Sequence, residues 1–273
     1  MRELKIKEYL RNELCELRGL LGLDFSSCLF DSVIIAGGAI TSLLQGEKPK
    51  DIDIYFSNYE DMRTFVSKLM NLMNLELDYI DNGTAGIQIK NKFCESKSKD
   101  DITIFVTENA ITINKKFQVI TRFTGDPDDL VKNFDFLHTK CYYHYKTNKL
   151  DLPASSLVSI LSKQLVFTNS AYPLCALFRI KKFMRRGWTI SVGELTKISL
   201  RLSMMNLLDP KVLRDQLTGV DIAYLADLTR ILKERAENGM EEDGVCSDLS
   251  IEYITDIIDN LTGVDGDEEV SPE

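Results

Sequence analysis

The apolar and polar positions in the first half of the chain follow helical and strand-like patterns in turn. Apolar residues recur every three to four positions over 3–21, which predicts an amphipathic helix that ends at Gly22. An apolar run at 33–36 predicts a strand, and polar–apolar alternation at 51–56 predicts another. The residues between them, 39–45, have helical character. Expected next are a helix at 59–74, strands at 77–80, 85–90 and 102–106, a hairpin or strand pair within 110–124, a short helix with Asp126 as cap and Pro127 at its first position, and an aromatic-rich strand at 134–145.

Helical periodicity replaces this mixture after about residue 150. We therefore expect an α/β (α+β) domain with a mixed sheet, followed by an all-helical domain. The predicted boundaries are 1–150 for the first domain, with its N-terminal helix, and 151–236 for the second. Residues 237–273 are expected to form a linker, one short helix and an acidic tail. The helices predicted after residue 150 are 154–168, 172–186, 192–207, 210–217, 220–236 and 248–262.

Composition and charge narrow the class of protein. Of 273 residues, 44% are hydrophobic and 27% are charged, which fits a packed globular protein and excludes a collagen-like or wholly disordered chain. The 33 Lys and Arg against 42 Asp and Glu give a net charge of −9, which disfavours duplex DNA as a partner. The charged N-terminal segment differs from a secretory signal, and no apolar run reaches the roughly 18 residues of a membrane span. The six scattered Cys, with no CxxC pair, disfavour a zinc site and favour a cytoplasmic protein.

Two glycines and two aspartates carry the candidate chemistry. Gly37 and Gly38 lie between an apolar run and a helix, where backbone N–H groups at a helix N-terminus suit a phosphate. Asp51 and Asp53 alternate on the following strand, so both side chains project to one face. Adjacent carboxylates repel each other unless a cation lies between them, and Mg²⁺ with a nucleotide phosphate prefers oxygen ligands. Each pattern alone is common in ordinary structure; their order and spacing together favour a metal–phosphate site.

These residues resemble a known signature. The stretch VIIAGGAITSLL…KPKDIDIYF is similar to that of the DNA polymerase β-like nucleotidyltransferase superfamily, in which Gly-Gly after an apolar run is followed by Asp-x-Asp in a strand. The continuation, with FQVITRF, a short helix and an FDF stretch at 134–136, resembles nucleotidyltransferases of phages and large viruses. The resemblance covers residues 30–145. It implies a phage protein in a host cytoplasm, with Mg²⁺ (or Mn²⁺) as cofactor and an NTP as substrate.

The resemblance also implies residue roles. Asp51 and Asp53 would bind two metal ions and the NTP phosphates, and Gly37 and Gly38 would cradle the phosphates. A third catalytic and metal-binding carboxylate on a neighbouring strand is expected. Asp135 is the preferred candidate because it lies at the N-terminal end of the strand predicted at 134–145, in the expected order, with Asp101 as the alternative.

Further candidates are weighed against ordinary structural roles. Thr41 and Ser42, one turn past the glycines, could touch phosphate or could be plain helix-surface residues. Arg122 could neutralise the acidic cluster or contact phosphate. His138 is interpreted as a packed structural residue. One segment, RIKKFMRRGW, is densely basic, and its Arg179, Lys182 and Arg186 share one helical face. This face could bind a triphosphate or an RNA backbone, or could be an ordinary solvated helix surface.

The sequence is compatible with three functions. The first is a template-independent nucleotidyltransferase that moves NMP from an NTP to an acceptor hydroxyl, with an RNA or tRNA 3′ end favoured. The second is a non-catalytic nucleotide- or partner-binding module on the same fold. The third is a toxin-like or anti-defence nucleotidyltransferase that modifies tRNA or protein. The third shares the chemistry of the first and differs only in its target.

Overall fold

The computed structural model describes residues 2–22, 27–83, 86–90, 93–97, 102–217 and 255. The chain divides into two compact units, Met1–Asn169 (unit 1) and Ser170–Glu273 (unit 2). Unit 1 therefore extends past the boundary predicted near residue 150. The helices predicted at 220–236 and 248–262, with the linker and acidic tail, lie outside the described residues apart from Thr255. None of the described helices is long and apolar enough to cross a membrane.

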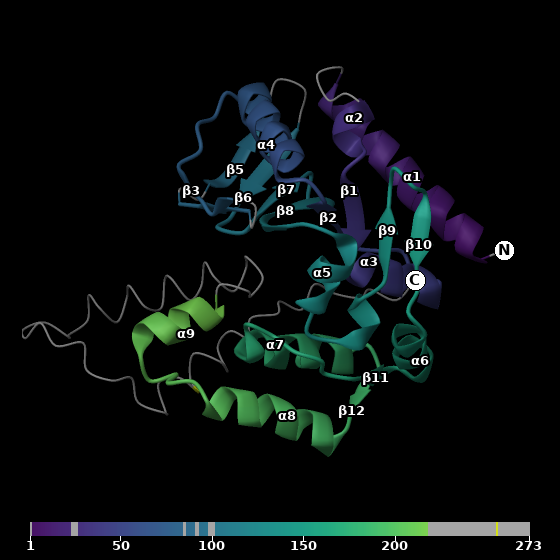
Figure 1. Ribbon diagram of the computed structural model, residues 1–273, viewed down its shortest axis with the longest axis vertical. Helices are drawn as coiled ribbons and strands as arrows, with labels where there is room; N and C mark the ends of the chain where they lie inside the picture. Colours follow the sequence, from purple (N-terminus) through teal and green to yellow (C-terminus); the bar gives the residue numbers. More distant parts are fainter. Residues whose placement is uncertain are drawn as a thin grey trace, which may run out of the picture. The chain divides into compact units, whose positions relative to one another are not determined.

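Unit 1 is a mixed α/β structure (Figure 1). Its elements are α1 (Arg2–Leu21), α2 (Ser27–Phe30), β1 (Val33–Ala36), α3 (Gly38–Gln45), β2 (Ile52–Phe56), α4 (Tyr59–Met73), β3 (Tyr79–Asp81), β4 (Ile87–Ile89), β5 (Phe93–Lys97), β6 (Thr103–Val106), β7 (Ala110–Ile113), β8 (Phe117–Thr124), α5 (Pro127–Lys132), the 3-10 helix η2 (Leu137–Thr139), β9 (Tyr142–His144), β10 (Lys149–Asp151), α6 (Ala154–Ser162) and β11 (Gln164–Leu165). The α/β class predicted from the sequence is confirmed.

The central sheet has the strand order β10-β9-β1-β2-β8-β7-β6-β5. Its neighbours pair antiparallel except β2 and β8, which run parallel, so the sheet is mixed as predicted. The strands predicted around the Gly-Gly and Asp-x-Asp segments are β1 and β2, and the helix between them is α3. The predicted hairpin within 110–124 is β7 and β8. This arrangement brings the residues after β1 next to the start of β2.

The two faces of the sheet differ in burial. One face carries fully buried apolar side chains, including Ile35, Ile54 and Val119, and α4 packs here through Phe65 against Phe56, with ring centroids 5.3 Å apart. The opposite face, which we call the Asp53 face, carries half-buried side chains on β2, β8, β7 and β6. Alternation along each strand separates the two sets. The half-buried polar side chains of this sheet, Asp53 among them, therefore lie on the Asp53 face.

Helix α5 covers part of the Asp53 face. Its Leu130 and Val131 form a buried cluster with Ala36, Tyr55 and Tyr142 of the sheet. The sequence predicted its start correctly: Asp126 caps the helix by accepting a hydrogen bond from the Asp128 N–H at 3.0 Å, and Pro127 occupies the first turn.

Two predicted elements of unit 1 are wrong in extent. The strand predicted at 134–145 is β9 alone; before it, the chain makes one isolated bridge from Phe136 to Phe167 and then the turn of η2. The helix predicted at 154–168 ends at Ser162, where Lys163 adopts a left-handed conformation with φ 50°. The chain after it returns to the Phe136 segment, because Leu137 N–H donates to the Val166 carbonyl at 3.0 Å. Strand β5 was not predicted.

Unit 2 is helical in its described part. It contains α7 (Pro173–Met184), β12 (Thr189–Ile190), α8 (Val192–Ser203) and α9 (Pro210–Leu217), and α7 contacts both α8 and α9. Trp188 is buried and packs edge-on against Phe183, with ring centroids 5.4 Å apart. The single tryptophan is therefore a packing residue in this unit.

Candidate functional site

The turn between β1 and α3 leaves the start of the helix open. Gly37 has φ 88° and ψ −144°, a conformation that only glycine adopts readily, and it precedes α3 as its cap residue. As the cap residue, Gly37 has no side chain that could accept a hydrogen bond from the first turn of the helix. The first N–H groups of a helix have no intrahelical acceptor, so an anion at this point can accept hydrogen bonds from them.

Asp53 lies against this turn. The β1–β2 register pairs Ala36 with Asp53, one residue before Gly37. A Cβ placed on Gly37 would lie only 3.1 Å from Asp53 Oδ2. The missing side chain at Gly37 therefore makes room for the Asp53 carboxylate beside the open end of α3.

Asp51 lies just before β2 and is exposed. The next residue is fixed to the β7–β8 turn, because Ile52 N–H donates to the Lys116 carbonyl at 2.8 Å. The Lys116 ammonium in turn pairs with two carboxylates of α1, Glu13 at 2.5 Å and Glu16 at 2.9 Å. Helix α1 thus anchors the turn that holds the start of β2, next to Asp51.

The strands beside β2 do not supply a third carboxylate at the level of Asp53. Paired residues on adjacent strands project to the same face, and the partners of Asp53 are Ala36 on β1 and Gln118 on β8. Within the part of the chain that the structure describes, no group of three His, Cys, Asp or Glu side chains could hold a metal ion. Asp101 lies outside the described residues.

Asp135 does not begin a strand, which corrects the structural reason for choosing it. It is buried in the loop between α5 and η2, and its carbonyl accepts hydrogen bonds from Thr168 N–H at 2.8 Å and Thr168 Oγ1 at 3.2 Å. Burial lowers the pKa of the Lys140 ammonium, and the negative charge of Asp135 opposes this shift. Sequence reasoning missed Lys140, since no motif marks it.

The η2 turn ties this loop to the glycine turn through two hydrogen bonds. Gly37 N–H donates to the Thr139 carbonyl at 3.2 Å, and Thr41 Oγ1 donates to the His138 carbonyl at 2.7 Å. The buried hydroxyl of Thr41 is therefore engaged with the protein backbone. Ser42, the next residue, is half-buried on α3.

His138 is a packed residue. It is fully buried and stacks on Phe136, with ring centroids 5.7 Å apart. Burial lowers its pKa to about 3, so the imidazole is neutral in the folded protein at neutral pH.

The predicted basic residues do not gather beside Asp53 within unit 1. Arg122 lies in the bulged part of β8, between the residues paired with Ile54 and Phe56, and donates to Asn109 Oδ1 at 3.2 Å. A strand rises about 3.3 Å per residue, so Arg122 lies several residues along β8 from Gln118. The remaining predicted nucleotide-binding residues, Arg179, Lys182 and Arg186, belong to unit 2, in or just after α7.

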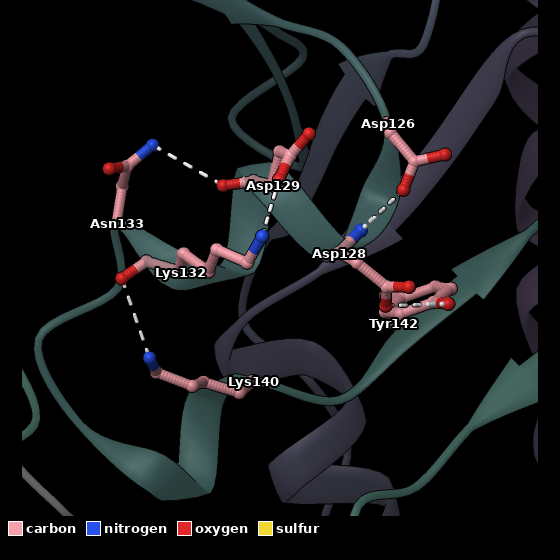
Figure 2. Close-up of polar contacts among 7 residues, drawn as sticks. All are labelled: Asp126, Asp128, Asp129, Lys132, Asn133, Lys140 and Tyr142. Atoms are coloured by element: carbon pink, nitrogen blue, oxygen red, sulfur yellow. Dashed lines mark hydrogen bonds and ion pairs between the residues drawn. The ribbon is translucent and has the colours of Figure 1, made fainter.

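The acidic residues at the start of α5 serve the helix itself. Figure 2 shows Asp126 capping the helix, Asp129 paired with Lys132 at 2.6 Å, and Asp128 accepting from the Tyr142 hydroxyl at 3.2 Å. In the same view the Lys140 ammonium reaches the Lys132 carbonyl at 3.4 Å. Negative side chains in a first helical turn are favourable, so these residues need no metal.

The residues at the glycine turn fit a Mg²⁺–nucleotide. Proteins usually give Mg²⁺ one or two carboxylates and leave its other positions to phosphate oxygens and water. Asp51 and Asp53 would supply the carboxylates, and Gly37, which has no side chain, leaves room for Asp53 at the start of α3. The donor set suits phosphate and a hard divalent cation.

Comparison with known proteins gives similarities in sequence and in fold. A "Gabija anti-defense 2" protein of Bacillus phage SPbetaL7 is 27% identical over 192 residues, which cover 70% of this chain and 42% of that protein, so the chain spans less than half the length of this curated relative. Among solved structures, the Thermotoga maritima CCA-adding enzyme complexed with tRNA is similar with a TM-score of 0.43 and 11% identity, covering 77% of this chain and 49% of the other. The Bacillus stearothermophilus CCA-adding enzyme in complex with CTP follows with a TM-score of 0.37 and 15% identity over 75% of this chain and 51% of the other.

The family match includes the glycine turn, the strands β1 and β2 on either side of it, and Asp135. The model of the Gabija anti-defense 2 family matches residues 8–163, which is more than half of the chain. On this match, the chain is a member of the Gabija anti-defense 2 family.

Proposed function

We propose that the protein is a nucleotidyltransferase, which moves a nucleoside monophosphate from an NTP to an acceptor hydroxyl. The observation that carries this proposal is the Asp53 carboxylate beside Gly37 at the start of α3. Carboxylates and phosphates are both negative and repel each other, so the two can lie side by side at a helix N-terminus when a divalent cation binds both. Mg²⁺ or Mn²⁺, held by Asp51 and Asp53, would neutralise charge on the phosphate oxygens.

The proposed reaction is a single displacement at the α-phosphorus. The acceptor oxygen forms a bond to this phosphorus, and the bond from the phosphorus to the oxygen that bridges to the β-phosphate breaks. The electron pair of the broken bond leaves with pyrophosphate. Asp135 lies in the loop that the η2 turn ties to the glycine turn, and we propose it as the base that would take the acceptor proton. The backbone N–H groups at the start of α3, from Gly38 onward, would hold the leaving phosphates, and Gly37, whose N–H donates to the Thr139 carbonyl, would leave room for them.

The proposed acceptor is an RNA or tRNA 3′ end. The support is the basic side chains of Arg179 and Lys182 on α7 and of Arg186 just after it, in a chain of net charge −9. Cationic side chains on one helical face suit a phosphate backbone.

The physiological setting we propose is counter-defence in a phage-infected cell. The support is membership of the Gabija anti-defense 2 family and the phage relative. The transferase would then modify tRNA or protein in a bacterium that carries the Gabija defence. The alternative is that the same fold acts by binding a nucleotide or a partner, without catalysis.

Label transfer tests the proposal directly. Purified protein is incubated with each α-³²P-NTP, Mg²⁺ or Mn²⁺, and either total tRNA, total RNA or cell protein. Transfer is expected in the wild type and is expected to be absent in Asp51→Asn and Asp53→Asn variants. Asp78→Asn, the same change at a surface carboxylate paired with Lys90, is the matched control and is expected to be active. Absence of transfer with every acceptor would contradict the transferase assignment.

Phage plating separates catalysis from binding. The wild type, Asp53→Asn and Asp78→Asn are expressed in cells that carry the Gabija defence. Loss of protection of the phage only in Asp53→Asn supports an enzymatic counter-defence. Full protection by Asp53→Asn, with the variant folded, would favour the non-catalytic module.

A further inference from the structure

A row of side chains continues from Asp53 across the sheet. The registers pair Asp53 with Gln118 on β8, Gln118 with Thr112 on β7, and Thr112 with Phe105 on β6. Directly paired residues project to the same face, so Gln118, Thr112 and Phe105 form a strip on the Asp53 face. All three are half-buried, whereas their neighbours along each strand are fully or nearly fully buried on the other face.

The three side chains of this strip differ in chemistry. The Gln118 amide both donates and accepts hydrogen bonds and carries no charge. The Thr112 hydroxyl oxygen is buried and has no hydrogen-bond partner among the described residues, so Thr112 serves as the packed link between the other two. The Phe105 ring offers an aromatic surface, on which a base can stack regardless of its identity.

The order of these groups matches the order of groups in a nucleotide. Adjacent strands lie about 4.8 Å apart, so each residue of the strip is one strand spacing farther from Asp53. A nucleotide whose phosphates lie at Gly37 and Asp53, and whose sugar and base extend across the strands, would meet the Gln118 amide first and the Phe105 ring last. An uncharged amide beside Asp53 adds no repulsion toward phosphate.

We propose that Gln118 and Phe105, at the two ends of this strip, bind the nucleoside part of the NTP, with Gln118 hydrogen-bonded to the ribose or base edge and Phe105 against the base. This inference rests on the proposed function, because it takes the phosphate position from the glycine turn. It adds a nucleoside subsite and makes Gln118 a specificity-determining residue.

Inorganic tripolyphosphate separates this subsite from the phosphate site. Calorimetric titration measures the binding of Mg²⁺–tripolyphosphate and of each Mg²⁺–NTP. The wild type is expected to bind its preferred NTP more tightly than tripolyphosphate. Gln118→Leu and Phe105→Leu are each expected to weaken NTP binding about tenfold, the scale of one lost hydrogen bond or stacking contact, and to leave tripolyphosphate binding unchanged. Thr121→Val, which removes a hydroxyl from β8 on the buried face, is the control and is expected to match the wild type.

The outcomes separate the two proposals. Equal affinity of the wild type for NTP and tripolyphosphate, or unchanged NTP affinity in Gln118→Leu and Phe105→Leu, overturns the nucleoside subsite and leaves the phosphate site standing. If the wild type binds neither Mg²⁺–tripolyphosphate nor any Mg²⁺–NTP, both the nucleoside subsite and the proposed phosphate site are refuted. Should a variant fail to fold, photolabelling of the wild type with an azido-NTP decides: label in β6, β7 or β8 supports the strip, and label elsewhere alone overturns it.

Discussion

Replacing Gly37 with alanine tests the geometry at the centre of the site. The backbone there has φ 88° and ψ −144°, and the added methyl group would lie 3.1 Å from Asp53 Oδ2. A non-glycine residue in this region costs about 1–3 kcal/mol of folding free energy. The Asp53 carboxylate must also move away from the methyl group, which displaces it from the open end of α3. Gly37→Ala is therefore expected to lose both stability and Mg²⁺–NTP affinity.

Gly38→Ala is the matched control. An added Cβ at Gly38 meets nothing within 4 Å, and the residue is helical. Alanine is favoured over glycine in a helix by up to about 1 kcal/mol, so this variant is expected to be as stable as the wild type or more so.

Urea denaturation and calorimetric titration give the two readouts. Gly37→Ala is expected to lower the free energy of unfolding of unit 1 by about 1–3 kcal/mol, with a fall of about 2–4 °C in Tm per kcal/mol. Equal stability and equal nucleotide affinity in Gly37→Ala and Gly38→Ala would refute the argument that the Gly37 conformation places Asp53.

Three further predictions concern the supports of the site. Thr41→Val leaves the buried His138 carbonyl without its donor and is expected to cost about 1–3 kcal/mol in urea denaturation, whereas Thr41→Ser retains the bond; equal losses in both would contradict this role. Burial lowers the pKa of His138 to about 3 from an ordinary 6.5, so between these pH values the unfolded chain binds a proton that the folded chain does not. The free energy of unfolding is therefore expected to fall by about 1.4 kcal/mol for each unit by which the pH is lowered from 6.5 towards 3. His138→Gln should reduce that slope by one proton, and an unchanged slope would refute it. Lys116→Met leaves the Glu13 carboxylate without its partner and is expected to destabilise unit 1 by about 1–3 kcal/mol, measured against Lys132→Met, whose exposed pair should matter little.

The segment from β1 to β2 was predictable because its signals are local. An apolar run, a glycine pair, a helical stretch and an alternating strand follow one another within about twenty residues, and each has its own spacing. The same holds for the cap at Asp126 and Pro127. The strand predicted at 134–145 failed because no glycine or proline marks the η2 turn inside it. That turn is held by distant partners, Val166 and Gly37, which local patterns do not reveal.

The candidate site was predictable only in part for the same reason. The Gly-Gly and Asp-x-Asp spacing indicated that Gly37 and Asp53 serve one site, and the register of β1 and β2 brings them together. The residue beside Asp53 on the neighbouring strand depends on the parallel pairing of β2 and β8, which is a tertiary property. Gln118 therefore has no signal in the sequence beyond its place in an alternating strand.

The pairing of β1 has a consequence for how the chain is made. One edge of β1 is filled by β2, a near neighbour in sequence, but the other edge is filled by β9, whose Tyr143 pairs with Ile35 more than a hundred residues earlier. Such distant pairing forms late, because a long loop must close first. A nascent chain that has emerged only as far as β8 can bring Asp53 to Gly37 but lacks the Thr139 carbonyl that holds the glycine turn. The proposed nucleotide site is thus completed among the last parts of unit 1 during synthesis, and a ligand that binds there would stabilise only chains that have finished folding.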